Sequence, residues 1–126
     1  MGKQYLIDTN AAVDYLDNKL PPEANALIDK IESRISIITR IELLSWPNAT
    51  MQQTSVLEEF IRNSHVYNFQ EPMVQNTIGL RKKYRIKLPD AIIAATAIAN
   101  DQILITRDTK DFNKIEELQI INPHDL

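Results

Sequence analysis

Two carboxylates follow short apolar runs that have the character of buried strands. Asp8 ends the run YLID at residues 5–8, and Asp108 comes shortly after ILIT at residues 103–106. Parallel sheets bind ligands beyond the carboxyl ends of their strands, at the point where the strand order reverses. If these two strands are neighbours, we expect Asp8 and Asp108 to lie close together at that edge.

Asp90 stands at the head of an apolar helical run, KLPDAIIAATAIAND, directly after Pro89. An acid in the first turn of a helix faces unpaired backbone N–H groups and the positive end of the helix dipole, so Asp90 could be a structural cap. Asp8 has the same alternative, because it could cap a helix that begins at Thr9 or Asn10. Capping alone does not require these acids to converge on one edge of a sheet.

The other acids also have both a structural and a chemical interpretation. Thr39 and Glu42 in ITRIELL match the spacing of a capping box. Asp108 and Asp111 in RDTKDF could be a cap and a first-turn acid of a short helix. The argument for chemistry therefore rests on the whole set of acids.

A set of converging carboxylates suits a hard cation, because Mg²⁺ and Mn²⁺ prefer oxygen ligands. Two such ions roughly 3.5–4 Å apart can activate water and stabilise the leaving oxygen of a phosphodiester. Without metal, the carboxylates would repel and raise one another's pKa values. Neither His65 nor His124 has metal-ligand spacing, and the chain has no P-loop or glycine-rich dinucleotide turn.

Composition sets broad limits on class. The 126 residues suit a single domain spanning 1–126. The formal net charge of −3 argues against binding nucleic acid by overall charge, although a local basic patch could still bind it. The absence of cysteine excludes disulfides and thiolate metal sites. No apolar run approaches membrane-spanning length and there is no signal peptide, so we expect a cytoplasmic protein without a membrane partner.

Short apolar runs alternate with helical patterns along the chain. Strands are predicted at 5–8, 35–38, 65–69, 103–106 and 118–122. Helices are predicted at 11–18, 22–33, 39–46, 54–64, 73–84 and 89–100. Strands joined by crossover helices imply a parallel sheet covered on both faces, so we predict one α/β domain built as a three-layer α/β/α sandwich.

Four segments in this order and spacing, YLIDTN, ITRIELL, KLPDAIIAATA and LITRDTKDF, resemble those of PIN-domain proteins, and among them VapC-type toxin ribonucleases. The resemblance covers essentially the whole chain. It implies a five-stranded, mainly parallel sheet with strand order 3-2-1-4-5. It also implies a Mg²⁺- or Mn²⁺-dependent endoribonuclease that cleaves RNA, is usually a homodimer and is inhibited by a cognate antitoxin protein.

The resemblance also assigns roles to individual residues. Asp8, Glu42 and Asp90 match the main acidic positions of the family, and Asp108 matches a more variable fourth position. Asp8 and Asp90 would hold the metal, with Glu42 and Asp108 as direct or water-mediated ligands. The supporting positions, which would orient carboxylates or water or add a further acid, are Thr9, Asn10, Thr106 and Asp111.

Two features outside the acidic set remain open to two interpretations. The basic segment RKKYRIK at residues 81–87 could be a phosphate track for RNA, with Tyr84 stacking on bases, or it could be a solvated helix face. Trp46 in SWPNA, where the family often has a small residue, could anchor the core or contact a partner. The basic residues are Arg81, Lys82, Lys83, Arg85 and Lys87.

Three other protein classes are alternatives to the ribonuclease. A phospho-acceptor receiver domain is rejected because Asp8 has no second acid beside it and HVYNF ends without an acceptor Asp. A catalytically silent PIN-fold interaction module is a stronger alternative, but loss of a main acid would be expected there and all are present. A DNA-directed nuclease of the same fold also stays open, because the metal site does not read the 2′-OH.

Overall fold

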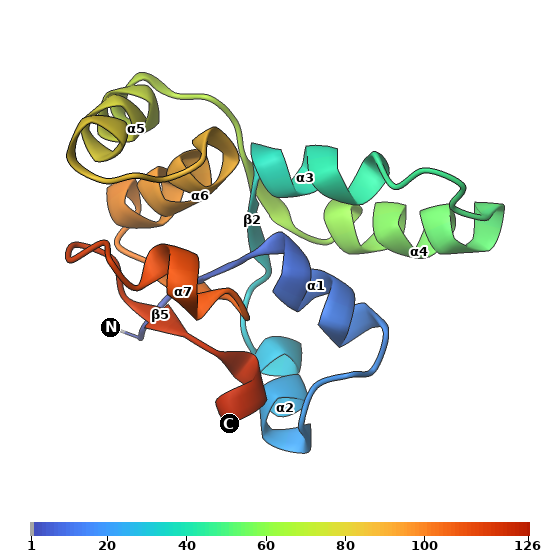
Figure 1. The fold of residues 1–126 in the computed structure, drawn as a ribbon. Coiled ribbons are helices and arrows are strands. Elements are labelled where there is room, and N and C mark those ends of the chain that lie inside the picture. Colours follow the sequence, from blue (N-terminus) through green and yellow to red (C-terminus); the bar gives the residue numbers. More distant parts are fainter. Residues whose placement is uncertain (1) are drawn as a thin grey trace.

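A computed structural model describes residues 2–126 and shows helices stacked around short parallel strands (Figure 1). The strands are β1 (Tyr5–Ile7), β2 (Arg34–Ser36), β3 (His65–Tyr67), β4 (Ile103–Ile105) and β5 (Ile120–Ile121). The helices are α1 (Thr9–Leu16), α2 (Pro22–Lys30), α3 (Ile37–Leu44), α4 (Met51–Arg62), α5 (Glu71–Lys83), α6 (Leu88–Ala99), α7 (Thr109–Phe112) and the 3₁₀ helix η1 (Pro123–Asp125). The elements follow the predicted order, and the strands are shorter than predicted.

The strands pair in parallel, in two groups. β1 pairs with β4 in a register that places Ile7 opposite Ile105, β4 pairs with β5, and β2 pairs with β3. Because β1 also lies beside β2, the order in space is the predicted 3-2-1-4-5. Within residues 2–126, however, the hydrogen-bonded ladder is interrupted between β2 and β1. Strands of two or three residues offer few backbone groups for pairing, and the sheet is therefore divided.

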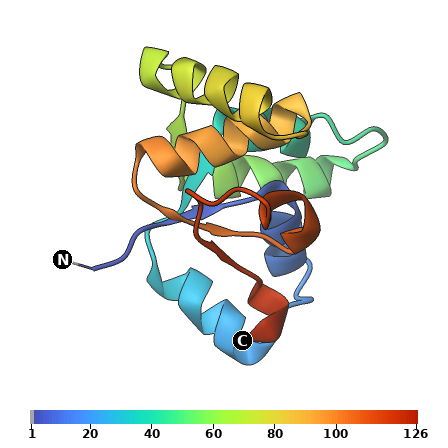
Figure 2. The ribbon, with the colours of Figure 1, turned by 60° about the vertical axis from the view of Figure 1, so that its left-hand side comes forward.

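Two hydrophobic clusters lie on opposite faces of the strands, as expected for a three-layer sandwich. Leu6 and Leu104 pack with residues of α5, α6 and α7, whereas their neighbours Ile7 and Ile105 pack with residues of α1, α2, α3 and α4. Successive side chains of a strand point to opposite faces, which explains this division. Figure 2 shows α5 and α6 above the strands and α2 below them. The predicted α/β/α sandwich is confirmed.

Helix α6 is the most deeply buried helical segment at the predicted site. Residues 91–97 are all buried, and the helix packs closely along α5. Its Ala and Ile side chains are apolar on every side, which is typical of a helix surrounded by protein. The acid at its head is therefore held by a rigid element.

None of the helices in the described part of the chain is long and apolar enough to cross a membrane.

Candidate functional site

Asp8 lies directly after β1 and caps α1, and it is only 5% exposed. Its Oδ1 accepts a hydrogen bond from the Thr9 backbone N–H at 2.8 Å, and its Oδ2 accepts from Thr106 Oγ1 at 2.7 Å. Burial raises the pKa of Asp8 to about 6, and the negative charges of Asp90 and Glu42 add to this rise. The hydrogen bonds from Thr106 and Thr9 oppose it. Asp8 is thus both a cap and a buried, perturbed carboxylate.

Asp90, Asp108 and Asp111 converge at the same edge of the sheet. Carboxylate oxygens of the three lie within 4.8 Å of one another. Asp90 comes from the first turn of α6, Asp108 from the residue before α7, and Asp111 from α7 itself. Burial raises the pKa of Asp90, and the charges of Asp111, Asp108 and Glu42 raise it further. The pKa of Asp108 is also raised, first by burial and then by Asp111.

Asp90 lies in the first turn of α6, where an acid can favour the helix dipole, but no hydrogen bond shows it capping the helix. The N-cap of α6 is Lys87, which makes no side-chain capping hydrogen bond, and Pro89 lies in the first turn. Among the side-chain hydrogen bonds of residues 2–126, none involves the Asp90 carboxylate. Asp90 instead faces other acids, an arrangement that is costly in the absence of a cation.

Glu42 reaches the site from α3 through a hydrogen bond to Thr9. Thr9 Oγ1 donates to Glu42 Oε1 at 2.6 Å, and it lies 3.0 Å from the hydroxyl of Thr39. The capping box predicted for Thr39 and Glu42 is wrong, because α3 begins earlier. Ser36 is the N-cap, its Oγ accepts from the Ile38 N–H, and Thr39 is buried inside the helix.

Polar side chains fix the orientation of Asp8 and of the turn after β4. Thr106 is fully buried, and its hydroxyl, besides donating to Asp8, accepts from the Asp108 backbone N–H at 3.0 Å. Asn10 Nδ2 donates to Asp8 Oδ2 at 3.2 Å, and Asn10 Oδ1 accepts from the Arg107 backbone N–H at 2.9 Å. The predicted supporting residues therefore contact the acids, while their role in metal binding stays a prediction.

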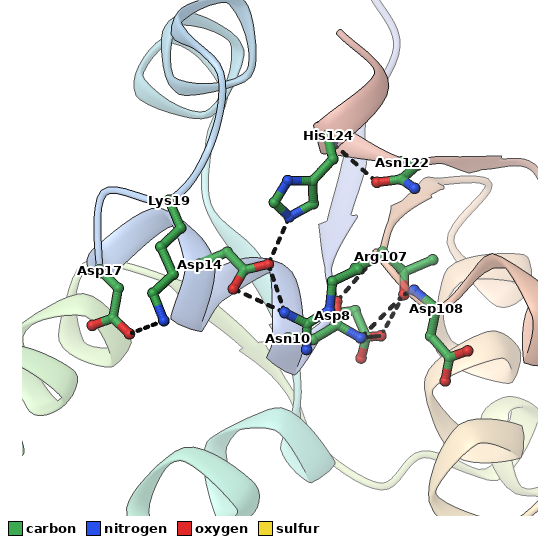
Figure 3. Close-up of polar contacts among 10 residues, drawn as sticks. Asp8, Asn10, Asp14, Asp17, Lys19, Arg107, Asp108, Asn122 and His124 are labelled. Carbon is green, nitrogen blue, oxygen red and sulfur yellow. Dashed lines mark hydrogen bonds and ion pairs between the residues drawn. The ribbon is translucent and has the colours of Figure 1, made fainter.

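One group of residues was not anticipated from the sequence. Asp14 of α1 is buried and contacts both Arg107 and His124 (Figure 3). The available signal was an acid at position 14, three residues after Ala11 on the apolar side of α1. A buried acid needs a partner, and Arg107 beside Asp108 was the nearest candidate in the site segments.

The basic residues lie at the end of α5 and in the link to α6, and all five are exposed. Lys87 is near enough to the acids to oppose the rise in the pKa of both Asp90 and Asp108. Lys83 pairs with Glu117 at 3.5 Å, and Tyr84 donates to the same carboxylate at 2.7 Å. Tyr84 also packs against the core, which argues against its predicted role as a stacking platform.

An apolar groove lies over α1, α3 and α4, and Glu42 is the one acid of the predicted site in its lining. Its volume is about 440 Å³; Thr9 and Glu42 lie in its lining, together with Val13, Leu16 and Trp46. Trp46 is 52% exposed, so its interpretation as a core anchor is wrong. The groove therefore places an exposed aromatic residue on the same surface as Glu42.

The donors at the acidic pocket are carboxylate oxygens, which is the ligand type that Mg²⁺ and Mn²⁺ prefer. Mutual repulsion among Asp90, Asp108 and Asp111 is the condition that a bound cation would relieve. Converging acids, hydroxyl and amide donors around them, and nearby Lys87 together suit the binding of a cation and a phosphate-containing substrate.

Comparison with known proteins agrees with this geometry. The family model of the PIN domain matches residues 5–118. A chain of a toxin–antitoxin complex from Klebsiella pneumoniae is 30% identical, with a TM-score of 0.77, over 95% of this chain and 98% of that one. A chain of VapBC2 from Rickettsia felis, bound to a promoter DNA fragment, is 25% identical, with a TM-score of 0.79, over 94% and 97%. Among curated protein sequences, no significant match was found.

Replacing Asp90 with Asn separates a cap from a metal ligand. Asn caps helices about as well as Asp, so a capping role predicts little change in stability with or without metal. A ligand role predicts that wild type is stabilised by Mn²⁺, by about 2.7 kcal/mol at a hundredfold excess over Kd, and that Asp90→Asn loses most of this gain. Thermal melts in EDTA and in saturating Mn²⁺ measure both quantities.

The matched control is Asp101→Asn, because Asp101 is exposed and has a φ of 53°, which Asn tolerates. This control should keep the full metal-induced shift. Equal shifts in wild type and Asp90→Asn would show that Asp90 does not bind the metal.

The raised pKa of Asp8 predicts a pH-dependent cost in the metal-free protein. The folded state holds the Asp8 proton more tightly than the unfolded chain, so the cost builds as pH rises from 3.8 to about 6. The difference corresponds to roughly 3 kcal/mol at neutral pH. The melting temperature of wild type should therefore rise, relative to that of Asp8→Asn, as pH falls from about 7 to about 4.5. A constant difference between the two proteins over this range would contradict the assignment.

Proposed function

The chain belongs to the PIN domain family, and we propose that it is a Mg²⁺- or Mn²⁺-dependent endoribonuclease that acts as the toxin of a toxin–antitoxin pair. The observation that carries the proposal is the convergence of Asp90, Asp108 and Asp111 within 4.8 Å, beside the buried Asp8. The similarity to chains of toxin–antitoxin complexes supports the biological context.

In this proposal Asp8 and Asp90 hold the cation, and Glu42 and Asp108 contribute directly or through water. When bound, Mg²⁺ or Mn²⁺ activates a water for attack on phosphorus and offsets charge on the leaving oxygen. Thr106 and Asn10 orient the Asp8 carboxylate through their hydrogen bonds to Oδ2, and Thr9 orients Glu42. Asp111 is a supporting acid, or replaces Asp108 as the fourth ligand, since both carboxylates lie beside Asp90.

The basic segment gives the RNA backbone a path to the acids. Arg81, Arg85 and Lys87 line one surface hollow, and Lys87 also acts electrostatically on Asp90 and Asp108. Neutralising phosphates along this segment would bring a phosphodiester to the edge of an otherwise anionic pocket. Lys82 extends the same track, while the pairing of Lys83 with Glu117 makes Lys83 the weakest candidate of the five.

The apolar groove suits an inhibitory partner. An amphipathic segment could place apolar side chains against Val13, Leu16 and Trp46 and bring an Arg or Lys toward Glu42, which lines the same groove. Such a partner would bury the exposed indole and place a positive charge beside Glu42 at once. A second copy of the chain, forming a homodimer, stays a separate prediction.

Cleavage assays test the nuclease proposal. Protein purified free of any inhibitor should cleave structured RNA with Mg²⁺ or Mn²⁺ and should not cleave it in EDTA. Asp8→Asn should keep the circular dichroism spectrum of wild type and lose activity by more than the roughly 10–100-fold typical of second-shell changes. Asp101→Asn, which alters an exposed carboxylate outside the site, should cleave at the wild-type rate.

Each other outcome has a defined meaning. Equal cleavage of single-stranded DNA of the same sequence would favour a DNA-directed nuclease. Folded wild type that cleaves neither polymer with either metal would favour the silent interaction module. Wild-type activity in Asp8→Asn would show that the assigned site is wrong.

Trp46 provides a direct test of the groove, because it is the only tryptophan in the chain. Binding of the protein encoded next to this one should shift Trp46 fluorescence to shorter wavelength as the indole leaves water. Trp46→Ala should weaken binding by about 2 kcal/mol or more, which is roughly 30-fold, as for aromatic hot spots. Phe69→Ala removes another exposed aromatic and should leave binding unchanged. Tight binding without any change in Trp46 emission would place the partner elsewhere.

A further inference from the structure

Asp14 is a buried carboxylate held by two cationic or polar partners from distant parts of the chain. It is 3% exposed, although it lies on α1 beside the apolar Ala11 and Ala12. Arg107 Nη1 donates to Asp14 Oδ1 at 3.1 Å and to Oδ2 at 3.0 Å, and His124 Nε2 lies 2.8 Å from Oδ2 (Figure 3). Burying a carboxylate is costly unless it is paired, so these contacts are strongly constrained.

Arg107 connects this carboxylate to the acidic site. It is the residue between Thr106, which donates to Asp8, and Asp108, which faces Asp90. Its backbone N–H donates to Asn10 Oδ1, and Asn10 in turn donates to Asp8 (Figure 3). The turn after β4 is therefore held twice, through the Arg107 side chain at Asp14 and through its backbone at Asn10.

We propose that Asp14 and Arg107 are positioning residues of the acidic site, which hold the turn carrying Asp108 and keep Asn10 against Asp8. The proposal rests on the proposed function of that site. Neither residue is a metal ligand in it. Each acts through a residue that contacts the acids.

The physical reason is the repulsion within the site itself. The carboxylates of Asp90, Asp108 and Asp111 lie within 4.8 Å of one another and repel, and α7, which follows Asp108, is a single short helix that offers little resistance to displacement. An exposed Arg side chain alone would sample many rotamers. Its attachment to buried Asp14 removes that freedom and opposes the displacement of the turn before a cation binds.

Two variants test the contact between Asp14 and Arg107, one at each residue. Asp14→Asn removes the buried charge, and Arg107→Ala removes the side chain from the 57% exposed end, which keeps a test available if the buried substitution does not fold. The control is Glu32→Gln, which breaks another Arg–carboxylate pair, with Arg34, at 2.6 Å and away from the site.

Two measurements are made below the melting temperature of every variant. In metal-free protein, hydrogen exchange of the backbone N–H groups at positions 107 and 108 reports on the turn. Mn²⁺ titration reports on the site. Both variants should lose protection at these two amides and bind Mn²⁺ about 10–100-fold more weakly, as is typical when the support of a metal ligand is removed. Arg107→Lys should recover part of the affinity, because an ammonium group can replace the single guanidinium nitrogen, Nη1, that contacts Asp14.

The double variant should lose little more amide protection and Mn²⁺ affinity than either single variant, since both substitutions break the same contact. Glu32→Gln should match wild type in both measurements. Variants that melt earlier but keep wild-type exchange at positions 107 and 108, or wild-type Mn²⁺ affinity, would overturn the proposal and leave Asp14 as a purely structural residue. Wild type that binds no Mn²⁺ would overturn the proposed function and the positioning role with it, whereas normal metal binding with unaffected variants would overturn the positioning role alone.

Discussion

The parallel pairing of β1 with β4 is the interaction on which the site depends. Ile7 lies opposite Ile105, and the Asp8 backbone N–H extends the ladder by donating to the Ile105 carbonyl at 2.9 Å. This register sets Asp8 beside Thr106, although 98 positions separate them in the sequence. A slip of one residue would exchange the two faces of the strand and move the acid away from its partners.

The helices contribute the other acids of the site, and bringing these charges together has an electrostatic cost. The rigid α6 presents Asp90, α3 presents Glu42, and the turn before α7 presents Asp108. Burial first, and then the charges of neighbouring acids, raise the pKa of Asp8 and of Asp90, so the protein without metal carries an unfavourable charge cluster. Local rules of helix capping and burial are satisfied elsewhere, for example by the true capping box at Thr50 and Gln53.

The sequence was sufficient to predict the fold class, because strand ends and helix starts are strong local signals. The carboxylates that meet within 4.8 Å are Asp90, Asp108 and Asp111, whereas the sequence placed Asp8, Glu42 and Asp90 first and Asp111 only in support. The sequence was insufficient where a local motif fitted two different helix starts. Thr39 and Glu42 match a capping box by spacing, but Ser36 caps α3 because the helix begins directly after β2. Likewise, no spacing rule relates Asp14 to Arg107 and His124, since their contact exists only after β4 and the C-terminal segment pack against α1.

The distribution of burial has a consequence for how proteins of this design can diversify. Residues 91–97 of α6 are buried on all sides, so a larger side chain at almost any of these positions would disturb the packing that holds Asp90. The segments at 45–49 and 81–87 are largely exposed, and they contribute to two separate surface hollows, one over α1, α3 and α4 and one at the link between α5 and α6. Surface substitutions can therefore reshape either hollow while the packing of α6, and with it the position of Asp90, stays unchanged.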